Sequence, residues 1–146
     1  MTAREAPEKA MRHRVLIIDD EESMRLVLAR ILVTSLHAEV TLAGTCEQAL
    51  LLAGSYAYDA ILLDLLMPGI GGYEVLRRLR RASANVATPV IIVSVLADAA
   101  TKNRCMMSGA TGYLVKPVER NSLIAAVKEQ MAGRGKPKSN GKGEHA

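Results

Sequence analysis

Four short runs of apolar residues dominate the sequence, and none of them alternates with polar residues. They cover 14–19, 59–64, 89–94 and 112–116, and a weaker run covers 38–43. Continuous runs rich in Val, Ile and Leu are typical of strands that are covered on both faces, as in a parallel sheet. The pattern therefore predicts five strands, most of them fully buried.

Helical patterns lie between the predicted strands. The segment 98–108 has poor helical spacing and is assigned a helix mainly because a crossover connection is needed there. Strand and helix thus alternate five times, which predicts a doubly wound α/β domain with helices on both faces of the sheet. The predicted helices include 24–32, 45–54, 72–81, 98–108 and 122–131.

Two of these helices carry specific local signals. Thr45 followed by Gln48 three residues later predicts a capping box at the start of a helix. The other helix has apolar residues at the i, i+3, i+4, i+7 and i+8 positions of one face, which predicts that this face is buried. Its members are Met24, Val27, Leu28, Ile31 and Leu32.

The composition fits one domain with an aliphatic core. The chain has 146 residues, of which 49% are hydrophobic, but only 3% are aromatic and none is Phe or Trp. No apolar run approaches the roughly 18 residues that a membrane span needs, and the N-terminal segment lacks the apolar stretch of a signal peptide. Cys46 and Cys105 match no metal-binding spacing, and we expect free thiols in a cytoplasmic protein.

The positive charge of the chain is concentrated at its two ends. Residues 1–13 carry a net charge of +1 and residues 132–146 carry +3, which together equal the net charge of the whole chain, +4. The neutral central part gives weak support for nucleic-acid binding. We expect four of its arginines to form a solvated helix face rather than a docking patch: Arg77, Arg78, Arg80 and Arg81.

A polar side chain ends each of the four strong runs. Numbered as predicted strands, with 38–43 as the second, Asp19 and Asp20 lie at the end of the first strand and Asp64 at the end of the third. Ser94 lies at the end of the fourth strand and Lys116 at the end of the fifth. Ligands of open α/β sheets bind beyond the carboxyl ends of the strands. These five groups, from four separated segments, are therefore predicted to meet at one site.

The residue types at this edge predict phosphoryl chemistry. Three carboxylates held close together repel one another, and a hard divalent cation such as Mg²⁺ or Mn²⁺ relieves that repulsion. A carboxylate such as Asp64 can attack phosphorus and form an aspartyl phosphate. Lys116 and Ser94 supply a positive charge and a hydroxyl donor for phosphoryl oxygens.

Four motifs follow one another along the chain: VLIIDDEE, ILLDLLMPGIGG, VIIVSVLAD and GATGYLVKPV. Together they resemble the receiver domain of bacterial two-component response regulators, of the chemotaxis-regulator type. The spacings are 44 residues from Asp20 to Asp64, 30 from Asp64 to Ser94 and 22 from Ser94 to Lys116. The resemblance implies a flavodoxin-like sheet of order 2-1-3-4-5. It covers a receiver domain at 13–131. We expect a flexible segment at 1–12, and the Gly- and Lys-rich composition without periodicity predicts a basic, disordered tail or linker at 132–146.

The resemblance also implies a role for each site residue. Asp64 is the phosphoacceptor, Asp20 binds the metal directly, and Asp19 assists, often through water. Lys116 is the phosphate partner, Ser94 is the switch hydroxyl and Tyr113 is the switch aromatic. The remaining implied features are a metal ligand at the main-chain carbonyl of Leu66 and a cis bond before Pro117.

The sequence departs from the commonest family pattern beside the predicted site. Val95 replaces a residue that is usually Ala, while Leu66 and Leu96 replace residues that are frequently polar. These three positions line the phosphoryl pocket in the family, so they bear on its kinetics. The glycines of the loop after Asp64 are interpreted as an ordinary turn: Gly69, Gly71 and Gly72.

The predicted function is a phosphorylation-dependent signalling switch. A histidine kinase or phosphotransfer protein donates the phosphoryl group, and residues 94–128 then change the surface offered to an unknown downstream protein. The chain is expected to be no enzyme beyond its own phosphorylation and dephosphorylation. It is expected to be a monomer or a phosphorylation-dependent dimer.

Two other classes of protein are weighed against this prediction. A phosphohydrolase of the haloacid-dehalogenase type would carry a second Asp two residues after the nucleophile, where this chain has Leu66. A nucleic-acid-binding protein would use the basic tail, but the tail has no aromatic residue and no room for a helix-turn-helix.

Overall fold

Five parallel strands form a single sheet in the computed structural model, which describes residues 12–81 and 83–133. The sheet order is β2-β1-β3-β4-β5, which is the order that the family resemblance implies. Each strand ends within one residue of its predicted run. The strands are β1 (Arg14–Ile18), β2 (Glu39–Ala43), β3 (Ala60–Leu63), β4 (Val90–Ser94) and β5 (Gly112–Val115).

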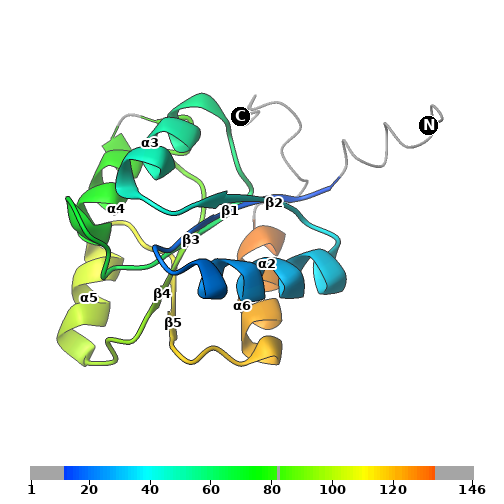
Figure 1. Ribbon diagram of the computed structural model, residues 1–146. Coiled ribbons are helices and arrows are strands. Elements are labelled where there is room, and N and C mark those ends of the chain that lie inside the picture. The colour runs from blue at the N-terminus through cyan, green and yellow to red at the C-terminus, as the bar shows by residue number, and fades with distance from the viewer. Residues whose placement is uncertain (1–11, 82, 134–146) are drawn as a thin grey trace.

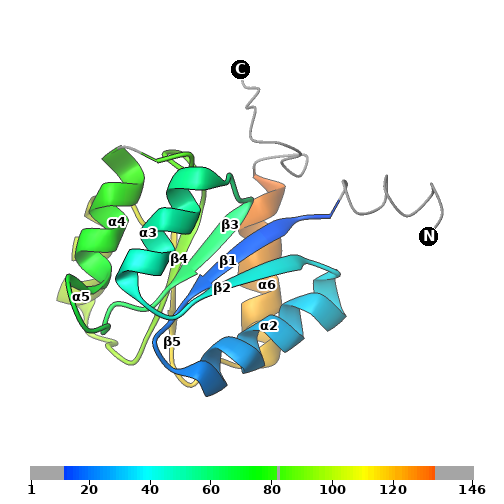
Figure 2. The same ribbon diagram turned by 45° about the horizontal axis from the view of Figure 1, so that its top comes forward.

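Helices cover both faces of this sheet in the described part of the chain. One face carries α3 (Cys46–Ser55), α4 (Gly71–Arg81) and α5 (Ala99–Met107), and the other carries α2 (Glu22–Leu36) and α6 (Arg120–Ala132), as Figures 1 and 2 show. Because successive strand residues point to opposite faces, β3 serves two apolar cores. Ile61 and Leu63 pack under α3 and α4, while Leu62 packs under α2 and α6.

The helix starts follow from side-chain caps. The Asp98 carboxylate accepts the Thr101 N–H at 3.0 Å and thereby begins α5, the segment with the poorest helical spacing. Thr45 Oγ1 accepts the Gln48 N–H at 3.0 Å, as the capping box predicts. The return bond of that box differs, because Gln48 Oε1 accepts from Gly44 N rather than from Thr45 N.

Two expectations about helix faces are wrong. Val27 is 54% exposed, because the buried stripe of α2 is centred on Leu28 and Leu32 and Val27 lies about 100° away from Leu28 around the helix axis. Arg80 is not part of a solvated face. Its Nε donates to the carbonyl of Gly109 at 2.9 Å and its Nη1 donates to the carbonyl of Asn85 at 3.1 Å, which ties the end of α4 to two loops.

Other sequence predictions have mixed outcomes. Cys46 and Cys105 are buried free cysteines, as expected. Among the described residues, no helix is both long enough and apolar enough to cross a membrane. The segments predicted to be flexible, 1–12 and 132–146, lie outside the described residues except for residues 12, 132 and 133.

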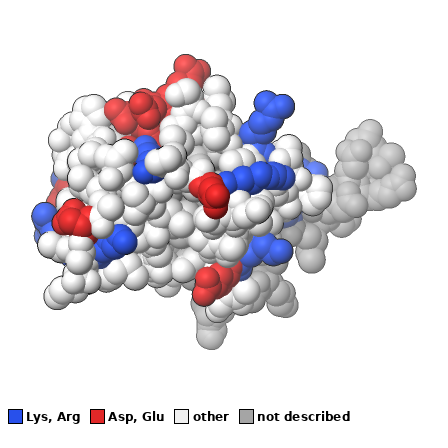
Figure 3. All heavy atoms as spheres, turned by 90° about the horizontal axis from the view of Figure 1, so that it is seen from below, with Lys and Arg blue, Asp and Glu red and all other residues white. Residues whose placement is uncertain are grey.

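Basic and acidic side chains are mixed on the face that Figure 3 shows. Most of the Lys and Arg side chains seen there are separated from one another or lie near an acidic one. This face of the described chain therefore offers no continuous basic surface of the kind that binds a nucleic-acid backbone.

Candidate functional site

The polar residues predicted at the strand ends lie along one edge of the sheet. Asp19 follows β1, Asp64 follows β3, Ser94 closes β4 and Lys116 follows β5. β1, β3, β4 and β5 are consecutive neighbours in the sheet. Residues that are far apart in sequence are therefore brought to one edge, as predicted.

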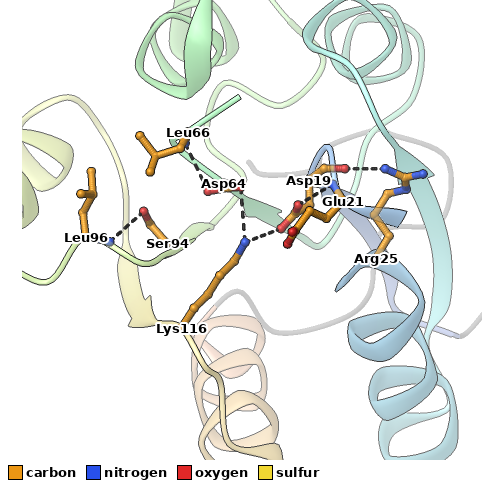
Figure 4. A network of polar contacts seen from close by, with 8 residues as sticks. All are labelled: Asp19, Glu21, Arg25, Asp64, Leu66, Ser94, Leu96 and Lys116. Carbon is orange, nitrogen blue, oxygen red and sulfur yellow. Dashed lines mark hydrogen bonds and ion pairs between the residues drawn. The ribbon is translucent and has the colours of Figure 1, made fainter. Parts of the chain in front are cut away.

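Lys116 joins the two buried carboxylates of the site. Its Nζ lies 2.8 Å from Asp19 Oδ2 and 3.3 Å from Asp64 Oδ2. Figure 4 shows the lysine side chain reaching up between the two acids. Asp19 and Asp64 are only 1% and 6% exposed. This ammonium group partly compensates two negative charges that would otherwise be costly to bury.

Backbone N–H groups hold the other oxygens of the two carboxylates. Asp19 Oδ1 accepts the Glu21 N–H at 2.9 Å, and Asp64 Oδ1 accepts the Leu66 N–H at 3.2 Å. In each carboxylate, one oxygen thus accepts the backbone N–H two residues further along the chain, and the other oxygen contacts the ammonium of Lys116. The side-chain orientation is fixed by these local bonds.

Arg25 supports the site in a way that sequence reasoning missed. Its Nη1 donates to the main-chain carbonyl of Asp19 at 2.7 Å (Figure 4). The side chain passes over Gly44, where an added Cβ would lie 2.8 Å from Arg25 Nη1. Sequence alone gives only a weak signal for this contact. Arg25 lies six positions after Asp19, and Gly44, which makes room for its side chain, lies in another segment of the chain.

The two central residues have shifted ionisation. Burial raises the pKa of the Asp64 carboxyl; the charge of Lys116 opposes this shift and the charge of Asp19 adds to it. Burial alone would lower the pKa of Lys116, but the hydrogen bond to Asp19 and the charges of Asp64 and Asp19 outweigh burial and raise it. Lys116 therefore stays protonated, whereas Asp64 is ionised at a cost.

The acidic groups are close enough to share a metal ion. One carboxylate oxygen from each of Asp19, Asp20 and Asp64 lies within 4.8 Å of the others. Asp20 is exposed, while the other two are buried, so the group opens to solvent on one side. Carboxylate oxygens with room for water are the ligands that Mg²⁺ prefers, and the donor set therefore fits this ion.

Three apolar residues lie one or two positions after Asp64 and Ser94 in the chain. Leu66 is 53% exposed and Val95 is 58% exposed, whereas Leu96 is partly buried against the core under α3, α4 and α5. The Ser94 hydroxyl is buried and accepts the Leu96 N–H at 3.2 Å (Figure 4). Packing explains in part why position 96 is apolar. It does not explain the apolar side chains at positions 66 and 95, which are exposed.

Tyr113 connects β5 to the loop that follows β4. Its hydroxyl donates to the carbonyl of Leu96 at 2.6 Å, and its ring packs on the core under α3, α4 and α5. Burial raises the pKa of Tyr113, so the phenol remains a hydrogen-bond donor at neutral pH. Further along the same segment, the Lys116–Pro117 bond is cis, the isomer that the family resemblance implies.

Gly72 contributes more than an ordinary turn. An added Cβ there would lie 2.4 Å from the carbonyl oxygen of Asp64 and 2.5 Å from Cα of Leu65. The first turn of α4 therefore packs directly on the backbone that carries Asp64. Gly69 and Gly71, which have φ values of +92° and +85°, let the intervening loop turn sharply.

The fold and the acidic site together define a flavodoxin-like domain with a carboxylate centre at the carboxyl edge of its sheet. The sequence model of the response regulator receiver domain matches residues 15–128. The chain thus belongs to the family of response regulator receiver domains.

Named relatives share this family. Response regulator GacA of Pseudomonas aeruginosa is 32% identical over 83% of this chain, and the sensory/regulatory protein RpfC of Xanthomonas campestris pv. campestris is 36% identical over 76% of it. The matched region spans 56% of GacA and 15% of RpfC, so the chain corresponds to part of each relative.

Solved structures have the same fold. A response regulator from Chloroflexus aurantiacus matches 83% of this chain and 98% of its own, with a TM-score of 0.78 and 31% identity. The receiver domain of the sensor histidine kinase PA1611 from Pseudomonas aeruginosa was solved with magnesium in its active-site cleft. It matches 83% of this chain and 98% of its own, with a TM-score of 0.75 and 28% identity. A Burkholderia pseudomallei response regulator with a phosphorylated aspartic acid and calcium matches 83% and 69%, with a TM-score of 0.73 and 27% identity.

Proposed function

We propose that the chain is a phosphorylation-dependent switch that accepts a phosphoryl group on Asp64. The observation that supports this most strongly is the pair of contacts that Lys116 makes to Asp19 and Asp64 beside a third carboxylate. A cation held between two acids can follow the charge when one acid is modified. The phosphorylated aspartic acid in the Burkholderia relative supports the same assignment.

The transfer step assigns a task to several residues. A carboxylate oxygen of Asp64 forms a bond to phosphorus while the bond between phosphorus and the donor histidine nitrogen breaks, and that nitrogen is reprotonated from solvent. Lys116 and the Ser94 hydroxyl then hold the phosphoryl oxygens. The chain acts on its own phosphoryl group and not on an external substrate.

A divalent cation, Mg²⁺ or Mn²⁺, belongs to this proposal. Asp19, Asp20, Asp64 and the main-chain carbonyl of Leu66 would hold it. When bound, it neutralises carboxylate charge and the charge that develops on the phosphoryl oxygens. The magnesium ion in the active-site cleft of the PA1611 receiver domain supports this choice.

The proposed phosphodonor is a sensor histidine kinase or a histidine phosphotransfer protein. Leu26 and Val27 on the first two turns of α2 are 53% and 54% exposed, beside the strand end that carries Asp19 and Asp20. Exposed apolar side chains next to a reactive site are suited to contact a protein donor. A cytoplasmic location belongs to the same proposal, and the two free cysteines fit a reducing compartment.

Intact-mass measurement after treatment with acetyl phosphate and Mg²⁺ tests the proposal. The wild-type chain should gain the mass of one phosphoryl group, stable in acid and labile in base. Asp64→Asn should gain none, and Asp98→Asn, the same change at an exposed helix cap, should gain it normally. Undiminished labelling of Asp64→Asn would refute Asp64 as the acceptor.

A further inference from the structure

A groove between α3 and α4 carries unbalanced positive charge. It is lined by Leu50 of α3, by Arg78 and Arg81 of α4, and by Ser83 just beyond α4. The two helices lie side by side in both ribbon views (Figures 1 and 2). The groove shares no lining residue with the site around Asp64.

Three arginines share a single carboxylate beside this groove. Glu74 lies 3.1 Å from Arg77, 2.9 Å from Arg78 and 3.9 Å from Arg81. One carboxylate can neutralise one positive charge, so two of the three charges remain. The hydrogen bond from Arg78 lowers the pKa of Glu74, which stays ionised at neutral pH.

The arginines that line the groove have capacity for another anion. Their side chains are 49% exposed for Arg78 and 62% exposed for Arg81. Arg78 meets Glu74 through Nε, and Arg81 approaches the same oxygen at the long distance of 3.9 Å. A guanidinium has five N–H donors and binds carboxylates in a bidentate manner, so each arginine retains donors for a bound acid.

Hydrogen bonds fix one end of the groove. The Ala84 N–H and Asn85 Nδ2 both donate to the carbonyl of Ala53 in α3, at 3.2 Å and 2.7 Å. Ser83 Oγ donates to the carbonyl of Leu79 in α4 at 2.8 Å. The segment that follows α4 is thereby tied to both helices, and the groove is formed before any partner arrives.

We propose that this groove binds an acidic peptide segment of a protein partner, one that presents carboxylates to Arg78 and Arg81 and an apolar side chain to Leu50. The next residue of α3, Leu51, is 71% exposed. A nucleic acid fits less well, because Glu74 would face its phosphates and the groove has no aromatic residue for base stacking. The inference does not depend on phosphorylation of Asp64.

Fluorescence anisotropy with the full chain tests this proposal. The probe is a short labelled peptide that contains several glutamates and leucines, with each type repeated every three to four residues. It is titrated at physiological salt. The double variant R78Q/R81Q should bind it about tenfold more weakly, as expected for the loss of two exposed charge pairs. R77Q is the matched control, because it also removes one partner of Glu74 but lies outside the groove lining, and its affinity should stay within about twofold.

Further arms separate the groove from general charge attraction. Leu50→Ser should also weaken peptide binding, and circular dichroism should show that each variant is folded. The proposal is overturned if the wild-type chain does not bind the peptide, or if R77Q weakens binding as much as R78Q/R81Q does. It is also overturned if a DNA duplex competes for the same arginines more tightly than the peptide.

Discussion

Lys116 lies closer to Asp19 than to the proposed phosphoacceptor. Its Nζ is 2.8 Å from Asp19 Oδ2 and 3.3 Å from Asp64 Oδ2. A phosphoryl group on Asp64 would add negative charge on the more distant side of the ammonium. We expect Lys116 to change partner when that charge arrives, and this exchange would move the segment that also carries Tyr113.

Lys116→Ala should therefore uncouple phosphorylation from the response. The variant should still be labelled by acetyl phosphate, although more slowly, because Asp64 and the acidic cluster remain. Backbone NMR with a phosphoryl mimic should show that most of the shift changes around Tyr113 are lost. Lys128→Ala, at an exposed position on α6, should respond like the wild type. Wild-type shift changes in Lys116→Ala would contradict this role.

Removing Asp20 should weaken metal binding and relieve repulsion at the same time. One oxygen from each of three carboxylates lies within 4.8 Å of the others, and Lys116 pairs with two of them, Asp19 and Asp64. We expect Asp20→Asn to bind Mg²⁺ at least about tenfold more weakly by calorimetry. Urea unfolding in EDTA should show a gain of about 0.5–1 kcal/mol, a modest value because Asp20 is exposed. Glu22→Gln is the control, and equal Mg²⁺ affinity in Asp20→Asn and wild type would count against the prediction.

The buried carboxylate of Asp64 should reduce stability as the pH rises. Its pKa is raised above the ordinary value of 3.8, chiefly by burial, so the folded protein retains a proton that the unfolded chain has lost. Stability then falls as the pH rises from 3.8 through the folded pKa. Asp64→Asn in EDTA should therefore be more stable than wild type at pH 7, and the difference should narrow toward pH 3.8.

Asp98→Asn provides a control of opposite sign. The hydrogen bonds from Thr101 lower the pKa of Asp98, so its contribution to stability is present above 3.8 and is lost as the pH falls through the folded pKa. This variant should be less stable than wild type at pH 7. If both variants shift stability in the same direction, the assignment of these pKa shifts is wrong.

The close approach of α4 to the site should make Gly72 intolerant of a side chain. An added Cβ would meet backbone atoms of Asp64 and Leu65, which cannot move aside as a flexible side chain can. We expect Gly72→Ala to cost about 2–4 kcal/mol in urea unfolding. Gly54→Ala, in a helix with nothing within 4 Å of the new Cβ, should instead gain about 0.5–1 kcal/mol. A loss in Gly72→Ala no greater than about 0.5 kcal/mol would contradict this packing.

Local pattern predicts the sheet and the residues at its edge, because continuous apolar runs and the polar residues that end them are adjacent in sequence. Contacts between distant segments do not have that property. Arg25 reaches the Asp19 backbone over Gly44, and Arg80 reaches Gly109, only because the folded chain brings these glycines under the two side chains. The exposure of Val27 likewise depends on how much of α2 the rest of the domain covers. The periodicity of apolar residues alone does not determine how wide a stripe of the helix is buried.

The apolar residues that follow Asp64 and Ser94 should prolong the phosphorylated state. An aspartyl phosphate decays when water attacks phosphorus in line with the bond to Asp64, and a polar side chain beside the pocket can orient that water. Leu66 and Val95, which follow Asp64 and Ser94 closely in the chain, are 53% and 58% exposed, and neither they nor Leu96 can hydrogen-bond a water molecule through the side chain. Positioning a proton-transfer group is worth a factor of ~10²–10⁴ where it acts fully, and less where a residue only lines the path.

Replacing both leucines tests that effect on the phosphoryl lifetime. Leu66→Asn with Leu96→Glu introduces polar groups two positions after Asp64 and two positions after Ser94, and we expect dephosphorylation to be about tenfold faster, well below the full value of a positioned acid or base. The decay is followed by intact mass in Mg²⁺ without a phosphatase. Leu66→Met is the control that keeps the side chain apolar, and its decay should match the wild type. If the double variant loses phosphate no faster than wild type, Leu66 and Leu96 do not keep attacking water away from the phosphoryl group. Other residues would then determine the lifetime.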